Sequence, residues 1–199
     1  MDFDLLGTEQ RVGKIRSVLE KRQPDFSLVL ENVHDPHNLS AVLRSCDAVG
    51  VLEVCLLYHS GQSMPAMAES SSASARKWLH FKNFTQVDEC FEYLRQSGKK
   101  IFTTHMGKDH LDLYEMDLTK PLALVFGNEH SGVSEEAFLR ADGNFLIPQV
   151  GMVQSLNISV AAAISVYEVF RQKRMAGHYN ETKLPEITFK QLLKEWLLK

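Results

Sequence analysis

Apolar segments of strand length alternate along this chain with segments that have the period of a helix, and this alternation limits the possible folds more than any other feature. The expected strands lie at about residues 27–32, 53–58, 100–104, 121–126 and 143–147. The expected helices lie at about residues 38–49, 86–97, 134–141 and 156–173. Such alternation favours a mostly parallel sheet with helices on both faces, so the predicted fold class is α/β.

Length and composition favour one main domain. With 199 residues and 44% hydrophobic content, the chain can bury one good core and has little room for a second. The serine-rich stretch at 61–75 is predicted to be a flexible connection inside this domain, because strand-like residues resume on both sides. The first residues lack an apolar signal region, and no apolar run approaches the roughly 20 residues that span a bilayer. We therefore expect a cytoplasmic protein without a membrane partner.

The cysteines and histidines do not suggest a disulfide framework or a metal site. Cys46, Cys55 and Cys90 are odd in number and lack C-x-x-C spacing. His34 and His37 stand without a nearby cysteine or acidic cluster, so a role in a turn or in contacting substrate is preferred for them over metal binding. We expect no metal.

Polar loops follow three of the expected strands. They are the turn at 32–38, the loop at 127–132 and the polar start of the stretch at 151–163, which runs into the last predicted helix. In open α/β sheets, ligands bind at the carboxyl ends of the strands, so these loops can form one pocket. Ser155 and Asn157 stand where the last predicted helix leaves its first amides unpaired. For either residue alone, a helix N-cap remains the simpler interpretation.

Together these segments resemble the three sequence motifs of the SpoU family of RNA 2′-O-methyltransferases, which belongs to the SPOUT class. The first motif, E-N-x-x-D-P-x-N-x-x-A-x-x-R, matches from Glu31 to Arg44. The second, F-G-N-E-x-x-G, matches from Phe126 to Gly132, and the third, I-P-x-x-G-x-x-x-S-L-N-x-S-x-A, matches from Ile147 to Ala161. Order and spacing agree, and the resemblance covers roughly residues 25–172. One departure is Gln149, where the family often has Met; it concerns only fine detail of cofactor binding.

This resemblance implies a SPOUT-type fold with a deep trefoil knot in the C-terminal half, which pattern reasoning does not predict because knots are nearly absent from folds. It also implies methyl transfer from S-adenosylmethionine to a ribose 2′-OH, and a homodimer with its sites near the subunit interface. The chain is then divided into an N-terminal helical extension (1–24), the methyltransferase domain (25–172) and a basic helical C-terminal extension (173–199).

By the same resemblance, Arg44 is the catalytic residue. The period of its helix sets Arg44 opposite the apolar stripe formed by Leu39, Val42, Leu43 and Cys46. Because arginine is effectively always protonated, aligning a substrate phosphate and stabilising an alkoxide is easier to accept than action as a base. An exposed arginine paired with Asp47 or solvated by water remains the alternative. The other implied catalytic residues are Asn38, Glu129, Ser155 and Asn157, and the implied cofactor-binding residues are Thr104, Gly127, Ile147 and Leu156.

Positive charge lies at the two ends of the chain. The net charge of −3 divides into +1 for residues 1–24, −8 for residues 25–170 and +4 for residues 171–199. An amphipathic helix is expected at 8–22, with basic residues along the border of its apolar stripe. The basic residues of the two clusters are Arg11, Lys14, Lys21, Arg22, Arg171, Lys173 and Arg174. A solvated surface is the alternative for each cluster, but two basic clusters that flank an acidic core favour phosphate binding. Arg11, Lys14, Arg171 and Arg174, together with His34, are the predicted RNA contacts.

The extensions also bear on which RNA is modified. Members of the family that act on large ribosomal RNA commonly carry a separate globular N-terminal domain, and minimal wobble-position tRNA enzymes have almost nothing outside the core. This chain, with its helical extensions, resembles the type that methylates guanosine eighteen in the tRNA D-loop. Methylation of ribosomal RNA and an RNA-binding role without catalysis are the alternatives.

Overall fold

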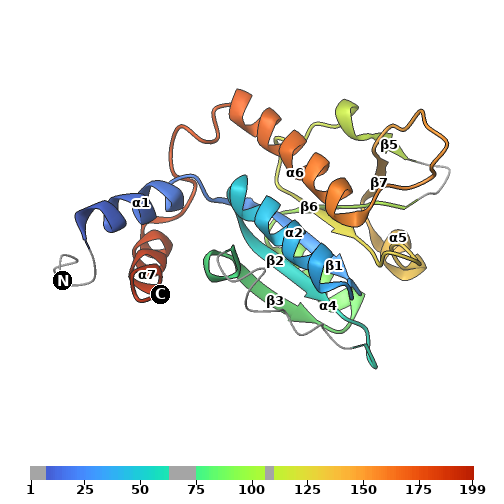
Figure 1. The fold of residues 1–199 in the computed structure, drawn as a ribbon, viewed down its shortest axis with the longest axis horizontal. Helices are drawn as coiled ribbons and strands as arrows, with labels where there is room; N and C mark the ends of the chain where they lie inside the picture. Colours follow the sequence, from blue (N-terminus) through green and yellow to red (C-terminus); the bar gives the residue numbers. More distant parts are fainter. Residues whose placement is uncertain (1–7, 63–74, 106–109) are drawn as a thin grey trace.

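A seven-stranded sheet forms the centre of the molecule (Figure 1). The structure, a computed structural model, describes residues 8–62, 75–105 and 110–199. The strand order is β3-β2-β1-β6-β4-β7-β5, and every neighbouring pair is parallel, which confirms the predicted class. The strands are β1 (Gln23–Glu31), β2 (Val51–Leu57), β3 (His80–Phe84), β4 (Lys100–Thr103), β5 (Leu111–Asp112), β6 (Leu122–Phe126) and β7 (Gly143–Leu146).

Helices cover both faces of this sheet, as predicted. Helices α2 and α6 pack together over one face, and α4 and α5 contribute to the core on the other. The helices are α1 (Glu9–Leu19), α2 (Pro36–Ala48), α4 (Val87–Gln96), α5 (Glu135–Arg140), α6 (Ile158–Met175) and α7 (Glu186–Leu197), with 3₁₀ turns η2 (Ala75–Trp78) and η3 (Leu113–Glu115).

The central strands show why the sheet needs two covering layers. Alternate side chains of a strand point to opposite faces. In β1, Leu28 and Leu30 enter the core beneath α2 and α6, while Val29 enters the core beneath α4. In β6, Leu124 enters the core beneath α2 and α6, and Val125 enters the core beneath α4. These strands are apolar on both faces because both faces are buried.

A third, smaller core joins the two ends of the chain. Helices α1 and α7 lie side by side at one end of the sheet (Figure 1). Their apolar faces bury Ile15, Leu19, Leu193 and Trp196 against Leu52 of β2. The boundaries predicted at residues 24 and 172 fall inside β1 and α6. The functional division of the chain therefore stays a prediction.

The structure corrects several predicted elements. Strands β3 and β5 lie outside the predicted strands, because β3 carries a mixed polar sequence and β5 is very short. The helix expected at 8–22 ends at Leu19, and Arg22 is fully buried rather than lying on a solvated border. Of the connection predicted at 61–75, residues 63–74 lie outside the described part of the chain.

Candidate active site

The three motif segments meet at the carboxyl edge of the sheet through a chain of side-chain hydrogen bonds. Asn38 of α2 donates its amide to Glu129 Oε1 at 3.2 Å. Asn157, before α6, donates its amide to Asn38 Oδ1 at 3.1 Å. These predicted residues come from three separate motif segments, and the structure brings them into direct contact.

Asn157 has a second role at the start of α6. Its Oδ1 accepts hydrogen bonds from the Ser159 amide at 2.8 Å and from the Ser159 hydroxyl at 2.6 Å. It is therefore the N-cap that the simpler interpretation of the sequence predicts, and the same side chain also binds Asn38. Ser155, two residues earlier, is exposed.

Arg44 projects from the exposed face of α2. The four stripe residues predicted from the helical period are all fully buried. Asp47, the alternative partner considered for Arg44, instead forms an ion pair with Arg22. Among the described residues, no hydrogen bond or ion pair holds the Arg44 guanidinium. It is thus available to a phosphate or a developing oxyanion.

Glu31, the first residue of the first motif, fixes the loops beneath this site. It is 1% exposed, and its carboxylate lies 2.6 Å from His59 Nε2. The other oxygen accepts a hydrogen bond from the Ser134 amide at 3.0 Å. Through these two contacts, Glu31 connects the ends of β1 and β2 to the start of α5. Sequence patterns do not single out His59 and Ser134, because neither belongs to a motif and both are distant from Glu31 along the chain.

Asn32 and Asn128 connect the first two motif loops. Asn32 has a left-handed φ of 50°, and its side chain accepts a hydrogen bond from the His59 amide at 3.1 Å. The Asn128 amide donates to the Asn32 carbonyl at 2.8 Å. Asparagine tolerates the left-handed region better than most residues, which suits it to this turn.

Gly127 permits a close approach within the second loop. A Cβ at this position would lie 2.1 Å from the carbonyl group of Gly132. The loop closes through an isolated antiparallel bridge between Asn128 and Gly132. Backbone groups can approach one another here only because residue 127 has no side chain.

Three of the four implied cofactor residues directly follow the ends of neighbouring strands. Gly127 follows β6, Thr104 follows β4 and Ile147 follows β7, and these strands are adjacent in the order β6-β4-β7. Thr104 donates its hydroxyl to the Val125 carbonyl at 3.1 Å, and Ile147 packs at the margin of the core. Leu156 is half-buried beside Asn157. The structure thus gathers Thr104, Gly127 and Ile147 along one edge.

The chemistry of this edge suits a polar cofactor. His105 follows Thr104, and its Nδ1 is buried without a hydrogen-bond partner among the described residues. The backbone of His105 is held by Asn144, which accepts from its amide at 2.7 Å and donates to its carbonyl at 2.6 Å. A positioned but unpaired nitrogen beside strand-end main-chain groups offers hydrogen bonds to a ligand. Two cavities of about 720 and 730 Å³ lie elsewhere, along α6 and beside α1.

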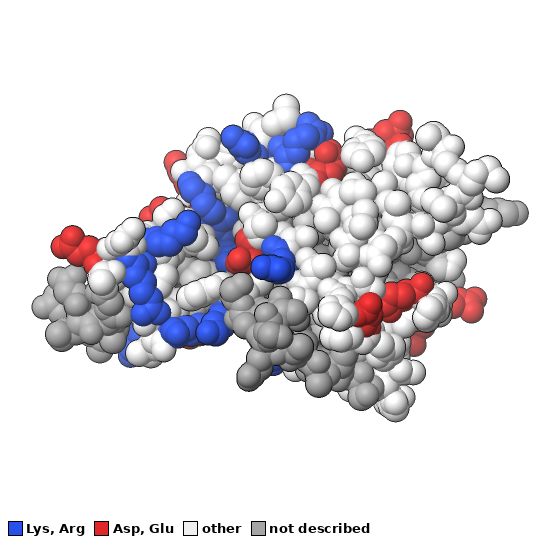
Figure 2. Space-filling view, in the orientation of Figure 1, with Lys and Arg blue, Asp and Glu red and all other residues white. Residues whose placement is uncertain are grey.

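Four of the five predicted RNA contacts lie away from the motif loops, on α1 and near the end of α6, and the fifth, His34, lies within the first motif loop. Arg11 and Lys14 are exposed on α1, and Arg174 is exposed near the end of α6 with its guanidinium 5.9 Å from the Phe170 ring centre. His34 is half-buried, 5.8 Å from the ring of Tyr58. In Figure 2, Lys and Arg side chains gather at the end of the molecule where the extensions lie.

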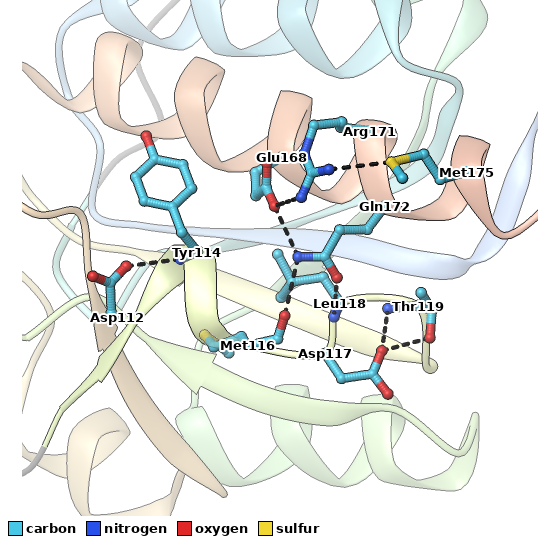
Figure 3. A network of polar contacts seen from close by, with 10 residues as sticks. All are labelled: Asp112, Tyr114, Met116, Asp117, Leu118, Thr119, Glu168, Arg171, Gln172 and Met175. Carbon is cyan, nitrogen blue, oxygen red and sulfur yellow. Dashed lines mark hydrogen bonds and ion pairs between the residues drawn. The ribbon is translucent and has the colours of Figure 1, made fainter.

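Arg171 is held in a network on the surface of α6 (Figure 3). Its guanidinium donates to both carboxylate oxygens of Glu168, at 2.7 and 2.8 Å. These hydrogen bonds lower the pKa of Glu168, which also accepts from Gln172 at 2.8 Å. The Arg171 side chain is nevertheless 55% exposed. The network therefore orients Arg171 without removing it from the surface.

Lys173 corrects the predicted basic cluster. It is fully buried, and its Nζ lies 2.8 Å from Asp25 Oδ2 and 3.1 Å from the Thr119 carbonyl. Burial lowers the pKa of Lys173, while the contact with Asp25 opposes this shift. Lys173, like Arg22, supports the packing of the chain and does not contribute a surface charge.

Metal sites and membrane-spanning helices are absent from the described part of the chain. Over residues 8–62, 75–105 and 110–199, no cluster of at least three His, Cys, Asp or Glu side chains is arranged to hold a metal ion. In the same ranges, no helix has both the length and the apolar character needed to cross a membrane.

Comparison with known proteins shows the class to which this sheet and its strand-end site belong. The model of the SpoU rRNA methylase family matches residues 25–167, and the chain belongs to this family. The tRNA (guanosine(18)-2′-O)-methyltransferase of Thermus thermophilus is 46% identical over 96% of this chain and 98% of its own length. The crystal structure of a TrmH/SpoU tRNA-modifying enzyme from A. aeolicus superposes with a TM-score of 0.88 at 37% identity, covering 97% of this chain and 96% of that one. The 23S rRNA (guanosine-2′-O-)-methyltransferase RlmB of Yersinia pestis is 34% identical over 84% of this chain, but only 68% of its own length is matched.

Proposed function

We propose that this protein transfers a methyl group from S-adenosylmethionine to the ribose 2′-OH of guanosine eighteen in the D-loop of tRNA. The observation that carries the proposal is the hydrogen-bonded chain Asn157–Asn38–Glu129, which joins all three family motifs on the helix that exposes Arg44. Tight positioning of two substrates can supply much of the rate of an in-line methyl transfer, so a rigid cluster of this kind suits the reaction.

The extents of the matches favour tRNA over ribosomal RNA. The relative named for tRNA guanosine eighteen matches this chain over 98% of its own length, and its match spans 96% of this chain. The relative named for 23S rRNA extends well beyond the matched part. The match to the tRNA relative therefore extends over nearly all of this chain.

S-adenosylmethionine, when bound, supplies a sulfonium methyl group that is open to attack by the ribose oxygen. Thr104, Gly127, Ile147 and Leu156 are proposed to hold it, together with main-chain groups at the ends of β6, β4 and β7. The buried His105 Nδ1 at the same edge is a further candidate partner. These residues bind and orient the cofactor, and no metal is proposed in the reaction.

Arg44 is proposed to bind the phosphate next to the target ribose and to stabilise negative charge as the 2′-oxygen loses its proton. Its guanidinium is exposed, and its planar set of N–H donors matches the oxygens of a phosphate. Asn38 and Glu129 position the loops and the ribose. Ser155 and Asn157 close the site from the third motif. Asn157 can do so without reorganising, because its side chain is already bound to Asn38 and Ser159.

The two basic clusters are proposed to bind the body of the tRNA through Arg11, Lys14, Arg171 and Arg174. His34, in the first motif loop, is a further proposed phosphate or base contact. The exposed guanidinium of Arg171 is held in one orientation by Glu168, which reduces the entropy that it loses on binding a phosphate. We also propose that the protein forms a homodimer, that its C-terminal half contains a deep trefoil knot and that it is located in the cytoplasm.

Transfer of tritiated methyl groups tests the proposed function directly. The full chain is incubated with labelled S-adenosylmethionine and either unfractionated tRNA or ribosomal RNA, and the labelled nucleosides are mapped. We expect 2′-O-methylguanosine at position eighteen of tRNA. Label in ribosomal RNA alone would show that the protein is a ribosomal RNA methyltransferase. RNA binding without any transfer would show a non-catalytic role.

A further inference from the structure

A cavity of about 730 Å³ lies where the extensions meet the sheet domain. Helix α1 lines one side, the C-terminal ends of α2 and α6 line another, and η2 and α7 complete it. This volume lies within the range of small-ligand sites. It is separate from the motif cluster, whose residues Asn38, Glu129 and Asn157 do not line it.

The cavity combines aromatic walls with basic side chains. Its aromatic residues are Trp78, Phe170, Tyr179 and Trp196, and its basic residues are Lys14, Lys21 and Arg174. Each of these three basic residues is exposed. Aromatic rings that can stack with a base, beside cations that can contact its phosphate, form the arrangement with which proteins bind unpaired nucleotides.

The charges inside the cavity favour an anionic occupant. Asp47 is the acidic residue of the lining, and its carboxylate is already paired with Arg22. Arg22 lies beneath the aromatic wall, with its guanidinium 5.1 Å from the Trp196 ring centre.

Helix α2 connects this cavity to the catalytic residue. Arg44 and Ala48 both lie on the exposed face of α2, and Ala48 lines the cavity. Four residues of helix span roughly 6 Å along the axis. An RNA strand that places a phosphate on Arg44 therefore needs to continue only a short distance to reach the cavity. In Figure 2, the basic side chains of this face gather around the same junction.

We infer that this cavity binds an unpaired nucleobase of the substrate tRNA, a few nucleotides away from the ribose that is methylated. The inference rests on the proposed function and adds a specificity site to it. The base stacks against the aromatic wall, and Lys14, Lys21 and Arg174 contact the adjoining phosphates. Recognition then requires both the target guanosine and a second unstacked nucleotide in fixed relation to it.

Tryptophan fluorescence provides a direct readout, because the chain has 2 tryptophans and both Trp78 and Trp196 line the cavity. Titration of the full chain with tRNA is expected to quench this fluorescence along the same curve as binding measured by filter retention. Ser17 is exposed on α1 and lines the cavity, so Ser17→Phe fills the space without removing a core side chain. We expect Ser17→Phe to abolish the quenching and to weaken tRNA binding about tenfold.

Gln10→Phe is the matched control. Gln10 is exposed on the same helix, about two turns from Ser17, and does not line the cavity. This variant should keep both the quenching and the tRNA affinity, and neither variant should change the affinity for S-adenosylmethionine.

Two results would overturn the inference while leaving the proposed function intact. One is tRNA binding and methylation without any change in tryptophan fluorescence. The other is wild-type tRNA affinity in Ser17→Phe, which would leave another partner, such as a protein segment, as the occupant. Failure of the wild-type chain both to bind and to methylate tRNA would instead reject the proposed function, and the inference with it.

Discussion

Helix α2 and the amino edge of the sheet use charged side chains in opposite ways. On α2, Arg44 is exposed and has no hydrogen-bond or ion-pair partner among the described residues, while the polar groups of the motif loops at the carboxyl edge bind one another. At the amino edge, Arg22 and Lys173 are fully buried and are paired with Asp47 and Asp25.

The buried and the exposed cations differ in how much hydration they lose when the chain folds. A buried cation has lost its water, so it needs carboxylate and carbonyl partners in the folded chain. Arg22 has both, since it also donates to the Val51 carbonyl at 2.7 Å, and burial still lowers its pKa while Asp47 opposes the shift. Arg44 keeps its water until a substrate displaces it. Arg22, which is buried and ion-paired, thus stabilises the fold. Arg44, which is exposed to solvent, is available for catalysis.

The largest expected effect is at Arg44 on α2. Arg44→Ala should reduce methyl transfer to tRNA by roughly 10²–10³-fold, because the charge on the reacting ribose loses its stabilising partner. The midpoint of thermal unfolding should barely move, since the side chain is exposed. Single-turnover transfer and a thermal scan measure the two quantities. Substantial remaining turnover would remove Arg44 from the catalytic role.

The amino edge should respond in the reverse way. Arg22→Ala leaves the Asp47 carboxylate and the Val51 carbonyl without their buried partner, so the free energy of unfolding should fall by about 3 kcal/mol. Urea denaturation measures it. Arg22→Met, which keeps much of the volume, should lose less. Equal stability of Arg22→Ala and wild type would contradict a structural role for this pair.

Asn157 combines both behaviours, and two substitutions separate them. Asn157→Ala loses the N-cap of α6, at about 1 kcal/mol, and should also weaken cofactor binding and turnover about tenfold. Asn157→Ser keeps a capping oxygen but lacks the amide that binds Asn38. It should retain stability and still lose turnover. Cofactor affinity is measured by calorimetry and turnover by the rate of methyl transfer. If both match wild type in both variants, Asn157 acts only as the N-cap of α6.

The smallest effect concerns the basic side chains of the extensions. If Arg11, Lys14, Arg171 and Arg174 neutralise phosphates, their replacement by Ala should flatten the salt dependence of tRNA affinity. The slope should fall by about 0.7–0.9 for each phosphate that is no longer neutralised. The affinity for S-adenosylmethionine should not change. The measurement is tRNA affinity over a series of salt concentrations.

A matched variant controls for net charge in this experiment. Lys82, Arg95, Lys100 and Arg140 are also exposed, on elements away from the extensions. Their replacement by Ala removes the same charge and should leave the salt slope close to that of wild type. Parallel lines for both quadruple variants would mean that the extensions are only a solvated surface.

Local features of this fold can be predicted from the sequence better than distant contacts can. The buried stripe of α2 can be predicted from the spacing of its apolar residues, because residues three or four positions apart lie on the same face of a helix. The contact of Asn38 with Glu129 and Asn157 joins residues 91 and 119 positions apart, and no local pattern encodes such a distance. The family resemblance implies that these residues form one site, but not the hydrogen bonds between them.

The charged residues show the limit of periodicity most clearly. Lys173 and Arg174 are neighbours with similar side chains, yet one is fully buried and the other is exposed. Their difference depends on Asp25, which lies near the start of β1, far from α6 along the chain, and accepts a hydrogen bond from Lys173. The sequence does not reveal His59 for the same reason, since its partner Glu31 comes from another strand.

The strand order also bears on how the chain is made on the ribosome. Strand β1 pairs with β2 on one side, but on the other side Leu28 pairs with Leu124 of β6. Roughly seventy residues separate the end of β2 from the end of β6, and translation at about 5–20 residues per second needs several seconds to produce them. During that interval, one edge of β1 has no partner, and an open apolar edge is a template for aggregation. The nascent chain is therefore most vulnerable before Phe126 emerges, and factors that shield apolar strands should matter most at that stage of synthesis.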